Sequence, residues 1–320
     1  MFNRITITLN LVTLCVLCLG CSMNGITQNK DFRSDTIYKN TELIFDAPKG
    51  ESKGTVLLIH GTAPQNIDGR IPIDDIQKYF RKTDPFHYAL KNVYKELSEN
   101  LNQLGWNTVR YTRLGVYNNK VDVEEYGKTD LKNIVDQLKS IWLTIPNNKP
   151  KIAFAWSGGS IHILQLPLKE ADAIVILGGI STKRTDVYKL SVKTSEQQRE
   201  LDNYLSDVFA KKAKVSRTAM LSNDMPFGRF FDEDDLNENW TYLKEYSQLP
   251  VLILHGNADT EVSLSQASVW KDKLPHHRID VIIKRNGNHA YGTTGNAPDM
   301  KDLAETMNRW LSTVLLPKTI

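Results

Sequence analysis

The sequence has only three cysteines, and all of them lie near its amino terminus. Cys15, Cys18 and Cys21 fall within the first 21 of 320 residues. Disulfide bonds therefore cannot cross-link residues 22–320 to one another, which excludes a small disulfide-rich scaffold. The sequence also lacks a large excess of positive or negative charge. Its formal net charge is only +3, and no basic run clusters with aromatic residues. A nucleic-acid partner is therefore not expected.

Ligand patterns for metals and phosphates are missing as well. No zinc-type spacing and no phosphate-binding glycine loop occurs. The run Asp232-Glu233-Asp234-Asp235 lacks the glycine and the ligand spacing of a calcium loop, so it is predicted to be a solvated acidic surface. The sequence thus predicts no metal and no organic cofactor.

What is present is the composition of an ordinary globular protein, with 41% hydrophobic and 24% charged residues. Short apolar runs alternate with segments of helical periodicity, which predicts an α/β protein with a mostly parallel sheet covered by helices on both faces. The expected strands are residues 36–38, 42–45, 55–59, 108–111, 152–156, 173–177, 251–254 and 279–283. The expected helices are residues 90–104, 131–141, 160–170 and 302–311.

The amino-terminal segment has the layout of an export signal. Arg4 is followed by an apolar stretch from Ile5 to Leu19 that is too short for a comfortable membrane span. The end of this stretch resembles a bacterial lipoprotein cleavage site, with small Gly20 before Cys21, although Cys18 stands where leucine is usual. The resemblance implies that Cys21 is lipidated and anchors an exported protein to a bacterial membrane facing the periplasm or exterior. Ser22 favours the outer membrane. The alternative is a plain signal peptide or an uncleaved anchor.

The stretch Lys151-Ile152-Ala153-Phe154-Ala155-Trp156-Ser157-Gly158-Gly159-Ser160 organises the rest of the chain. A buried strand ends abruptly at Ser157, and a helical segment follows it. Small residues at both second positions, Ala155 and Gly159, let strand and helix approach each other around a strained serine. The motif G-x-S-x-G therefore appears here as A-W-S-G-G, and Ser157 is the candidate nucleophile. The alternative is a glycine-rich turn after a buried strand.

A nucleophilic serine needs a base, and the base needs a carboxylate to orient it. Candidates should follow strands, because sites in open parallel sheets form at the carboxyl ends of the strands. Asp259 is the first carboxylate after the strand 251–254, with Glu261 and Asp186 as alternatives and a turn or helix cap as its structural role.

Among the seven histidines, His289 alone combines the expected chain order with a loop between the last strand and the last helix. His60 and His255 are expected to order their loops, and His87 is a candidate for lining the site. The remaining three are His162, His276 and His277.

Two backbone N–H groups must face the negative charge that develops on the substrate oxygen. Gly158 follows the nucleophile and is the expected first donor. The second is expected in the loop His60-Gly61-Thr62-Ala63, with Thr62 preferred and Ala63 as the alternative.

With these motifs in place, the chain resembles an α/β-hydrolase. It is similar to bacterial esterases and peptidase-like hydrolases with an H-G-S-G-P-x-D-R-D-G loop, which here has the sequence His60-Gly61-Thr62-Ala63-Pro64-Gln65-Asn66-Ile67-Asp68-Gly69. The family's R-Y-D-K-R-G segment here is Arg110-Tyr111-Thr112-Arg113-Leu114-Gly115, without the aspartate. The resemblance covers residues 36 to 315 and implies hydrolysis of carboxylic esters.

The expected domain organisation is a signal peptide (1–20), a polar tether (21–35), a hydrolase core (36–182 and 248–320) and a helical cap inserted before the acid-bearing strand (183–247). The aromatic residues Phe227, Phe230 and Phe231 either pack this cap or contact an apolar acyl group. Alternative functions are a peptidase or amidase with the same triad, and a surface lipoprotein that keeps the fold for binding alone.

Overall fold

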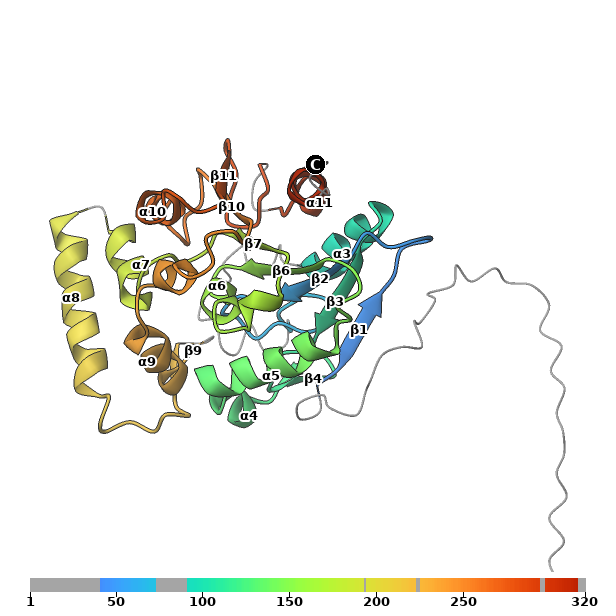
Figure 1. The fold of residues 1–320 in the computed structure, drawn as a ribbon. Helices are drawn as coiled ribbons and strands as arrows, with labels where there is room; N and C mark the ends of the chain where they lie inside the picture. The colour runs from blue at the N-terminus through green and yellow to red at the C-terminus, as the bar shows by residue number, and fades with distance from the viewer. Residues whose placement is uncertain (1–40, 73–90, 193, 223–224, 294–296, 316–320) are drawn as a thin grey trace, which may run out of the picture.

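The computed structural model describes residues 41–72, 91–192, 194–222, 225–293 and 297–315 (Figure 1). The predicted signal peptide, tether, strand 36–38, lipidated Cys21 and His87 lie outside these residues.

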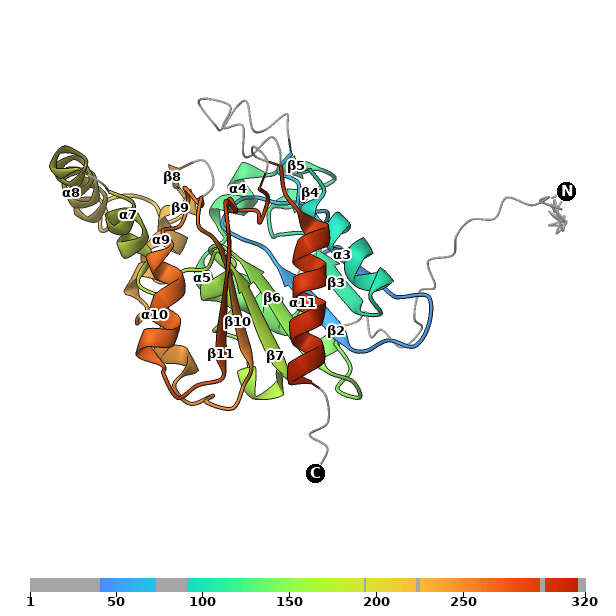
Figure 2. The ribbon, with the colours of Figure 1, turned by 90° about the horizontal axis from the view of Figure 1, so that it is seen from above.

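A seven-stranded sheet forms the centre of the molecule (Figure 2). Strand β1 pairs antiparallel with β3, and all other neighbours in the sheet pair in parallel. In spatial order the strands are β1 (Leu43–Asp46), β3 (Asn107–Tyr111), β2 (Thr55–Ile59), β6 (Lys151–Trp156), β7 (Ala173–Leu177), β10 (Val251–Gly256) and β11 (Ile279–Lys284). The expected mostly parallel sheet is confirmed.

Helices cover both faces of this sheet, which explains why its central strands are continuous apolar runs. Along β2, Val56 and Leu58 face one apolar cluster, while Leu57 and Ile59 face the other. Helices α3 (Val93–Gln103) and α11 (Met300–Val314) lie side by side over the first cluster. Helices α5 (Leu131–Thr144) and α10 (Ser265–Lys273) pack on the second.

The helix expected over residues 160–170 is shorter than predicted. Helix α6 spans Gly159–Ile163, and a separate 3₁₀ turn spans Leu168–Glu170. Pro167 separates the two, because proline has no N–H to donate and disfavours helical geometry in the residue before it. The prediction of one continuous helix was wrong.

Between β3 and α5, a two-residue hairpin joins β4 (Val116–Tyr117) to β5 (Lys120–Val121), followed by the short helix α4 (Val123–Gly127). Its turn residues Asn118 and Asn119 both have positive φ, as a tight hairpin turn requires.

A mainly helical insert lies between β7 and β10, beside the carboxyl ends of the strands (Figure 1). Its elements are α7 (Arg184–Ser191), α8 (Ser195–Ala210), β8 (Met220–Ser222), β9 (Met225–Pro226), α9 (Phe227–Asp235) and a 3₁₀ turn (Asn239–Leu243). The insert has its own small core, and Phe227, Phe230 and Phe231 are buried in it. These aromatic residues therefore pack the insert. None of the helices in the described ranges is both long and apolar enough to cross a membrane.

Candidate active site

Ser157 occupies a strained turn at the carboxyl end of β6. Its φ of 53° lies in the left-handed region, which costs a non-glycine residue energy and is typical of a nucleophile on a sharp turn between strand and helix. The turn is fixed on both sides. The Ser157 N–H donates to the Leu177 carbonyl at 2.8 Å, and the Ser157 carbonyl accepts from Ser160 N and Oγ at 3.0 and 2.7 Å.

The two small residues around Ser157 differ in how much room they have. A Cβ on Gly159 would lie 2.5 Å from the His60 carbonyl oxygen, so strand β2 and helix α6 can meet only if this residue is glycine. Ala155, by contrast, is a fully buried residue of β6 whose methyl group packs in a core cluster. Ala155 replaces the first glycine of G-x-S-x-G, and this position has room for a methyl group.

Asp259 and His289 are joined by a hydrogen bond of 2.7 Å between Oδ2 and Nδ1. The Asp259 side chain is only 1% exposed, and its other oxygen accepts from the N–H groups of Glu261 and Val262 at 2.8 and 3.0 Å. Asp259 follows β10 and His289 follows β11, so two loops at the same end of the sheet supply the pair.

The contact between Asp259 and His289 shifts the pKa of both residues. Burial alone would raise the pKa of Asp259, but the charge and hydrogen bond of His289 outweigh it and hold that pKa below its ordinary value. Burial alone would lower the pKa of His289, but the Asp259 carboxylate outweighs it and raises that pKa above 6.5. His289 thus has the environment of a base whose protonated form is stabilised by a fixed carboxylate.

Strand β7 connects Ser157 to this pair. Leu177 accepts the Ser157 N–H, and the next residue, Gly178, contacts the imidazole closely enough that a Cβ would lie 2.9 Å from His289 Nδ1. On the other side, the indole N–H of Trp156 donates to the His289 carbonyl at 2.9 Å. Trp156, just before Ser157, and Gly178, just after Leu177, therefore both contact His289. Ser157, Asp259 and His289 all follow strands at the same end of the sheet.

The two predicted oxyanion residues are also neighbours. A Cβ on Gly158 would lie 2.3 Å from Thr62 Oγ1 and 3.2 Å from Arg184 Nη1. A Cβ on Gly61 would lie 3.4 Å from the Cβ of Ser157. The loop after β2 therefore lies against the nucleophile turn, where an oxyanion loop is needed.

The alternative acids lie in other environments. The Glu261 side chain is on an exposed residue whose N–H binds Asp259. Asp186 lies on α7 and forms an ion pair with Lys189. Among the described residues, Asp259 is the carboxylate that binds His289.

Three other histidines have structural contacts. His60 Nε2 lies 2.7 Å from the Tyr111 carbonyl, and burial lowers its pKa to about 3. His255 Nε2 binds the Val262 carbonyl at 2.9 Å, which helps to fix the Asp259 loop. Burial lowers the pKa of His162 to about 4. The contacts of His60 and His255 order the surrounding backbone, as expected for these two residues.

The sequence predicted a solvated acidic surface for the run 232–235, but the structure buries part of this run. Glu233 and Asp234 are only 3% and 8% exposed. Glu233 Oε1 lies 2.9 Å from His162 Nε2, and Asp234 accepts the Thr185 N–H at 2.8 Å. The prediction was wrong because helix α9 turns one face toward the interior, and the two middle residues of the run lie on that face.

Sequence reasoning also missed three buried arginines that contact the loop Gly61-Thr62-Ala63. They are Arg113, Arg184 and Arg229, which are 2%, 7% and 0% exposed. One signal was available: Arg229 and Glu233 are four residues apart in a segment predicted to be part of a helical cap, and this is the spacing of an ion pair on a helix. No group of three or more histidine, cysteine, aspartate or glutamate side chains suited to a metal ion occurs within the described part of the chain.

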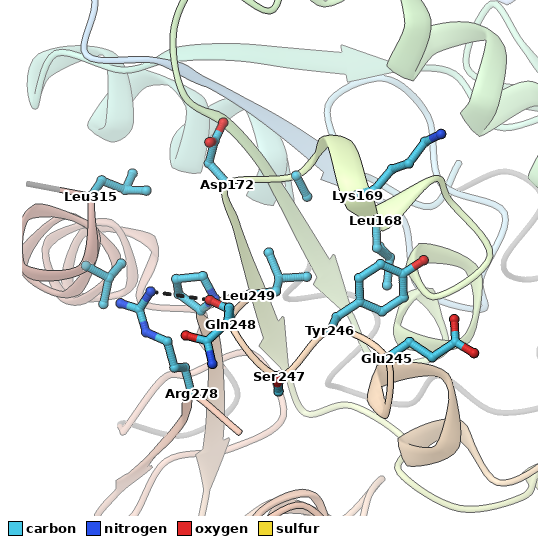
Figure 3. A pocket seen from close by; sticks show the side chains of 13 residues that line it. Leu168, Lys169, Asp172, Glu245, Tyr246, Ser247, Gln248, Leu249, Arg278 and Leu315 are labelled. Carbon is cyan, nitrogen blue, oxygen red and sulfur yellow. Dashed lines mark hydrogen bonds between the residues drawn. The ribbon is translucent and has the colours of Figure 1, made fainter. Parts of the chain in front are cut away.

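A separate hollow of about 520 Å³ opens at the opposite end of the sheet (Figure 3). Asp172, Pro250 and Arg278, which line it, precede β7, β10 and β11. Arg278 is tied to the Gln248 carbonyl at 3.3 Å. Because sites in parallel sheets form at the carboxyl ends, this hollow is not part of the candidate active site.

Comparison with known proteins shows the fold. No family model and no curated protein matches the sequence. Among solved structures, a soluble variant of monoglyceride lipase from Saccharomyces cerevisiae, in complex with a substrate analogue, is 14% identical, with 91% of this chain and 97% of that chain covered and a TM-score of 0.59. Est1E from Butyrivibrio proteoclasticus, with ferulic acid bound, is 13% identical over 87% and 96% of the two chains, with a TM-score of 0.57. An esterase from Thermogutta terrifontis is 12% identical over 87% and 97%, with a TM-score of 0.52. The chain has the α/β-hydrolase fold.

Proposed function

We propose that this protein is a serine hydrolase that cleaves carboxylic esters through an acyl-enzyme intermediate. The observation that carries the proposal is the 2.7 Å hydrogen bond between Asp259 and His289. The strained backbone of Ser157 and the contacts of Gly178 and Trp156 with His289 support it. The esterases and the lipase with the same fold support an ester as the substrate class.

The reaction follows from this arrangement. Asp259 occupies Nδ1 of His289, which leaves Nε2 to take the proton of Ser157 while Oγ forms a bond to the ester carbonyl carbon. The carbonyl oxygen becomes negatively charged and is held by the N–H groups of Gly158 and of Thr62 or Ala63. Collapse of this intermediate breaks the bond to the alcohol, which leaves with the proton from His289. Water then gives a proton to His289 and attacks the acyl group, and Ser157 regains its proton.

The direct test is labelling of the full-length protein, in detergent, with a fluorophosphonate probe. Wild-type protein should react at Ser157, and Ser157→Ala should not. Ser268→Ala, on an exposed position of α10, is the control and should react like wild type. An inert wild type would favour the alternative, a lipoprotein that uses the fold for binding alone. Paired ester and amide substrates with the same acyl group separate the esterase from the peptidase or amidase.

We also propose that the protein is exported and anchored to a bacterial membrane, with the outer membrane favoured, through lipid attached to Cys21. The support is the order of Arg4, the apolar stretch and Gly20-Cys21 in the sequence. Several acyl chains on one residue would hold the enzyme at a lipid surface, whereas a single chain binds only marginally.

A further inference from the structure

The carbonyl groups of the loop Gly61-Thr62-Ala63, hereafter the oxyanion loop, are all held by side-chain donors. Arg113 Nη1 donates to the carbonyls of Gly61 and Ala63. The Thr62 carbonyl accepts from the Tyr126 hydroxyl at 2.8 Å and from Arg229 Nη2 at 3.1 Å. Charged donors make hydrogen bonds about twice as strong as neutral ones, so this loop is firmly oriented.

Holding a carbonyl also orients the next N–H. In a planar trans peptide the C=O and the following N–H point in opposite directions. The hold of Arg113 on the Gly61 carbonyl therefore sets the Thr62 N–H, and the hold of Arg229 and Tyr126 on the Thr62 carbonyl sets the Ala63 N–H. These are the two candidates for the second oxyanion donor.

Two of the groups that hold the loop belong to the insert. Arg184 is the first residue of α7 and Arg229 lies in α9, whereas Arg113 and Tyr126 belong to the core. Arg184 Nη2 donates to Thr62 Oγ1 at 2.9 Å, beside Gly158.

Glu233 joins these arginines to the nucleophile side of the site. Its carboxylate lies 3.6 Å from Arg184 Nε and 3.9 Å from Arg229 Nε, and it binds His162 on α6 at 2.9 Å. Helix α6 begins two residues after Ser157. The side chains of Glu233 and His162 are both 1% exposed, so this connection is shielded from water and from salt.

We propose that Arg229 and Arg184 are positioning residues that hold the oxyanion loop in its catalytic shape, so that the insert contributes to the active site. The proposal rests on the proposed function. Cations behind the loop also favour negative charge in front of it, which adds to the effect of orienting its N–H groups.

The test compares Arg229→Gln and Arg184→Gln with Arg199→Gln, a matched control on the exposed side of α8 in the same insert. A misoriented oxyanion loop affects the transition state more than the bound ester. For Arg229→Gln we therefore expect kcat to fall about 10- to 100-fold with KM within about threefold of wild type. Affinity for an alkylboronic acid, whose serine adduct is a tetrahedral anion, should fall in parallel with kcat. Arg199→Gln should match wild type.

Two further variants separate positioning from loss of stability. Arg229→Lys restores a cationic donor and should recover part of kcat even if it melts at the same temperature as Arg229→Gln. In a double-mutant cycle, Tyr126→Phe and Arg229→Gln should be non-additive, because both remove donors to the same Thr62 carbonyl. Folded variants with wild-type kcat, or losses that follow melting temperature alone, would overturn the proposal.

Hydrogen exchange gives a readout that needs no substrate. In the full-length protein, peptides covering residues 57–66 should exchange hydrogen faster in Arg229→Gln than in wild type. Their exchange rate in Arg199→Gln should equal that of wild type. Unchanged exchange in Arg229→Gln would refute the positioning role. An active wild type with undisturbed variants refutes this inference alone, whereas a wild type that resists fluorophosphonate refutes the proposed function, on which this inference rests.

Discussion

A Cβ placed on Gly178 would lie 2.9 Å from His289 Nδ1 and 3.3 Å from Asp259 Oδ2, the two atoms that share the central hydrogen bond of the site. Gly178 also has a φ of 54°, which a side chain disfavours. The residue that follows β7 is therefore the one type that allows the imidazole and the carboxylate to meet here.

Gly178→Ala should therefore disturb the Asp259–His289 pair in two ways. The methyl group would push His289 away from Asp259, and the left-handed backbone would be strained. We expect kcat for an ester to fall at least about 100-fold, since misplacement of a catalytic group by about 1 Å has that effect. Gly50→Ala, a surface substitution with nothing within 4 Å of the new Cβ, should leave kcat unchanged. Similar rates for Gly178→Ala and wild type would show that His289 does not act as the base.

The pH dependence of ester hydrolysis should report His289. Asp259 raises the pKa of His289 above 6.5, and the base must be neutral to accept the Ser157 proton. The value of kcat/KM should therefore decline as pH falls through this raised pKa and level off above it. Asp259→Asn removes the charge that raises the pKa, so burial prevails and the inflection should move to lower pH. The same change should cost about 10³- to 10⁴-fold in kcat. An unmoved inflection would assign the titration to another group.

How much of this was visible in the sequence varies with the kind of interaction. The strands 55–59 and 173–177 were predicted to the residue, because each is an uninterrupted apolar run between breakers and the structure buries both faces of it. The positions of Asp259 and His289 after strands also followed from chain order. These features depend on local pattern and on a rule that applies to any parallel sheet.

The rest depends on contacts across long separations. Glu233 and His162 are 71 residues apart, and Arg229 and Thr62 are 167 apart, so no local pattern pairs them. The acidic run was therefore interpreted from its charge, which usually indicates solvent. Only the packing of the insert on the core shows that part of the run is buried.

Glu233 should make the folded state sensitive to acid. Burial alone would raise its pKa, but the Arg184 charge and the His162 contact lower it to about 2 from an ordinary 4.5. Because the unfolded chain binds this proton first, stability should fall as pH drops from about 4.5 toward 2. The pKa of His162, lowered to about 4, adds a loss between about 6.5 and 4, since here too the unfolded chain protonates first.

Glu233→Gln tests this assignment. Removing one member of a buried charged group should lower the free energy of unfolding at pH 7 by about 3 to 5 kcal/mol, because Arg184 and Arg229 lose their shared carboxylate. The variant should also lose the part of the acid sensitivity between pH 4.5 and 2. Asp235→Asn, in the same run but with a side chain 61% exposed, should change stability by less than about 0.5 kcal/mol. Urea unfolding at several pH values measures both, and equal effects of the two variants would contradict the assignment.

Membrane attachment should depend on one cysteine of three. If Cys21 carries the lipid, Cys21→Ser should move the protein from the membrane fraction to the aqueous fraction of the producing cells and abolish incorporation of a labelled fatty acid. Cys15→Ser is the matched control: it stands six residues earlier in the apolar stretch, outside the cleavage-site motif, and should leave both attachment and labelling intact. The two variants differ only in which thiol is removed, so a general disturbance of export would affect both. Retention of Cys21→Ser at the membrane would instead favour an uncleaved apolar anchor, because that anchor needs no thiol.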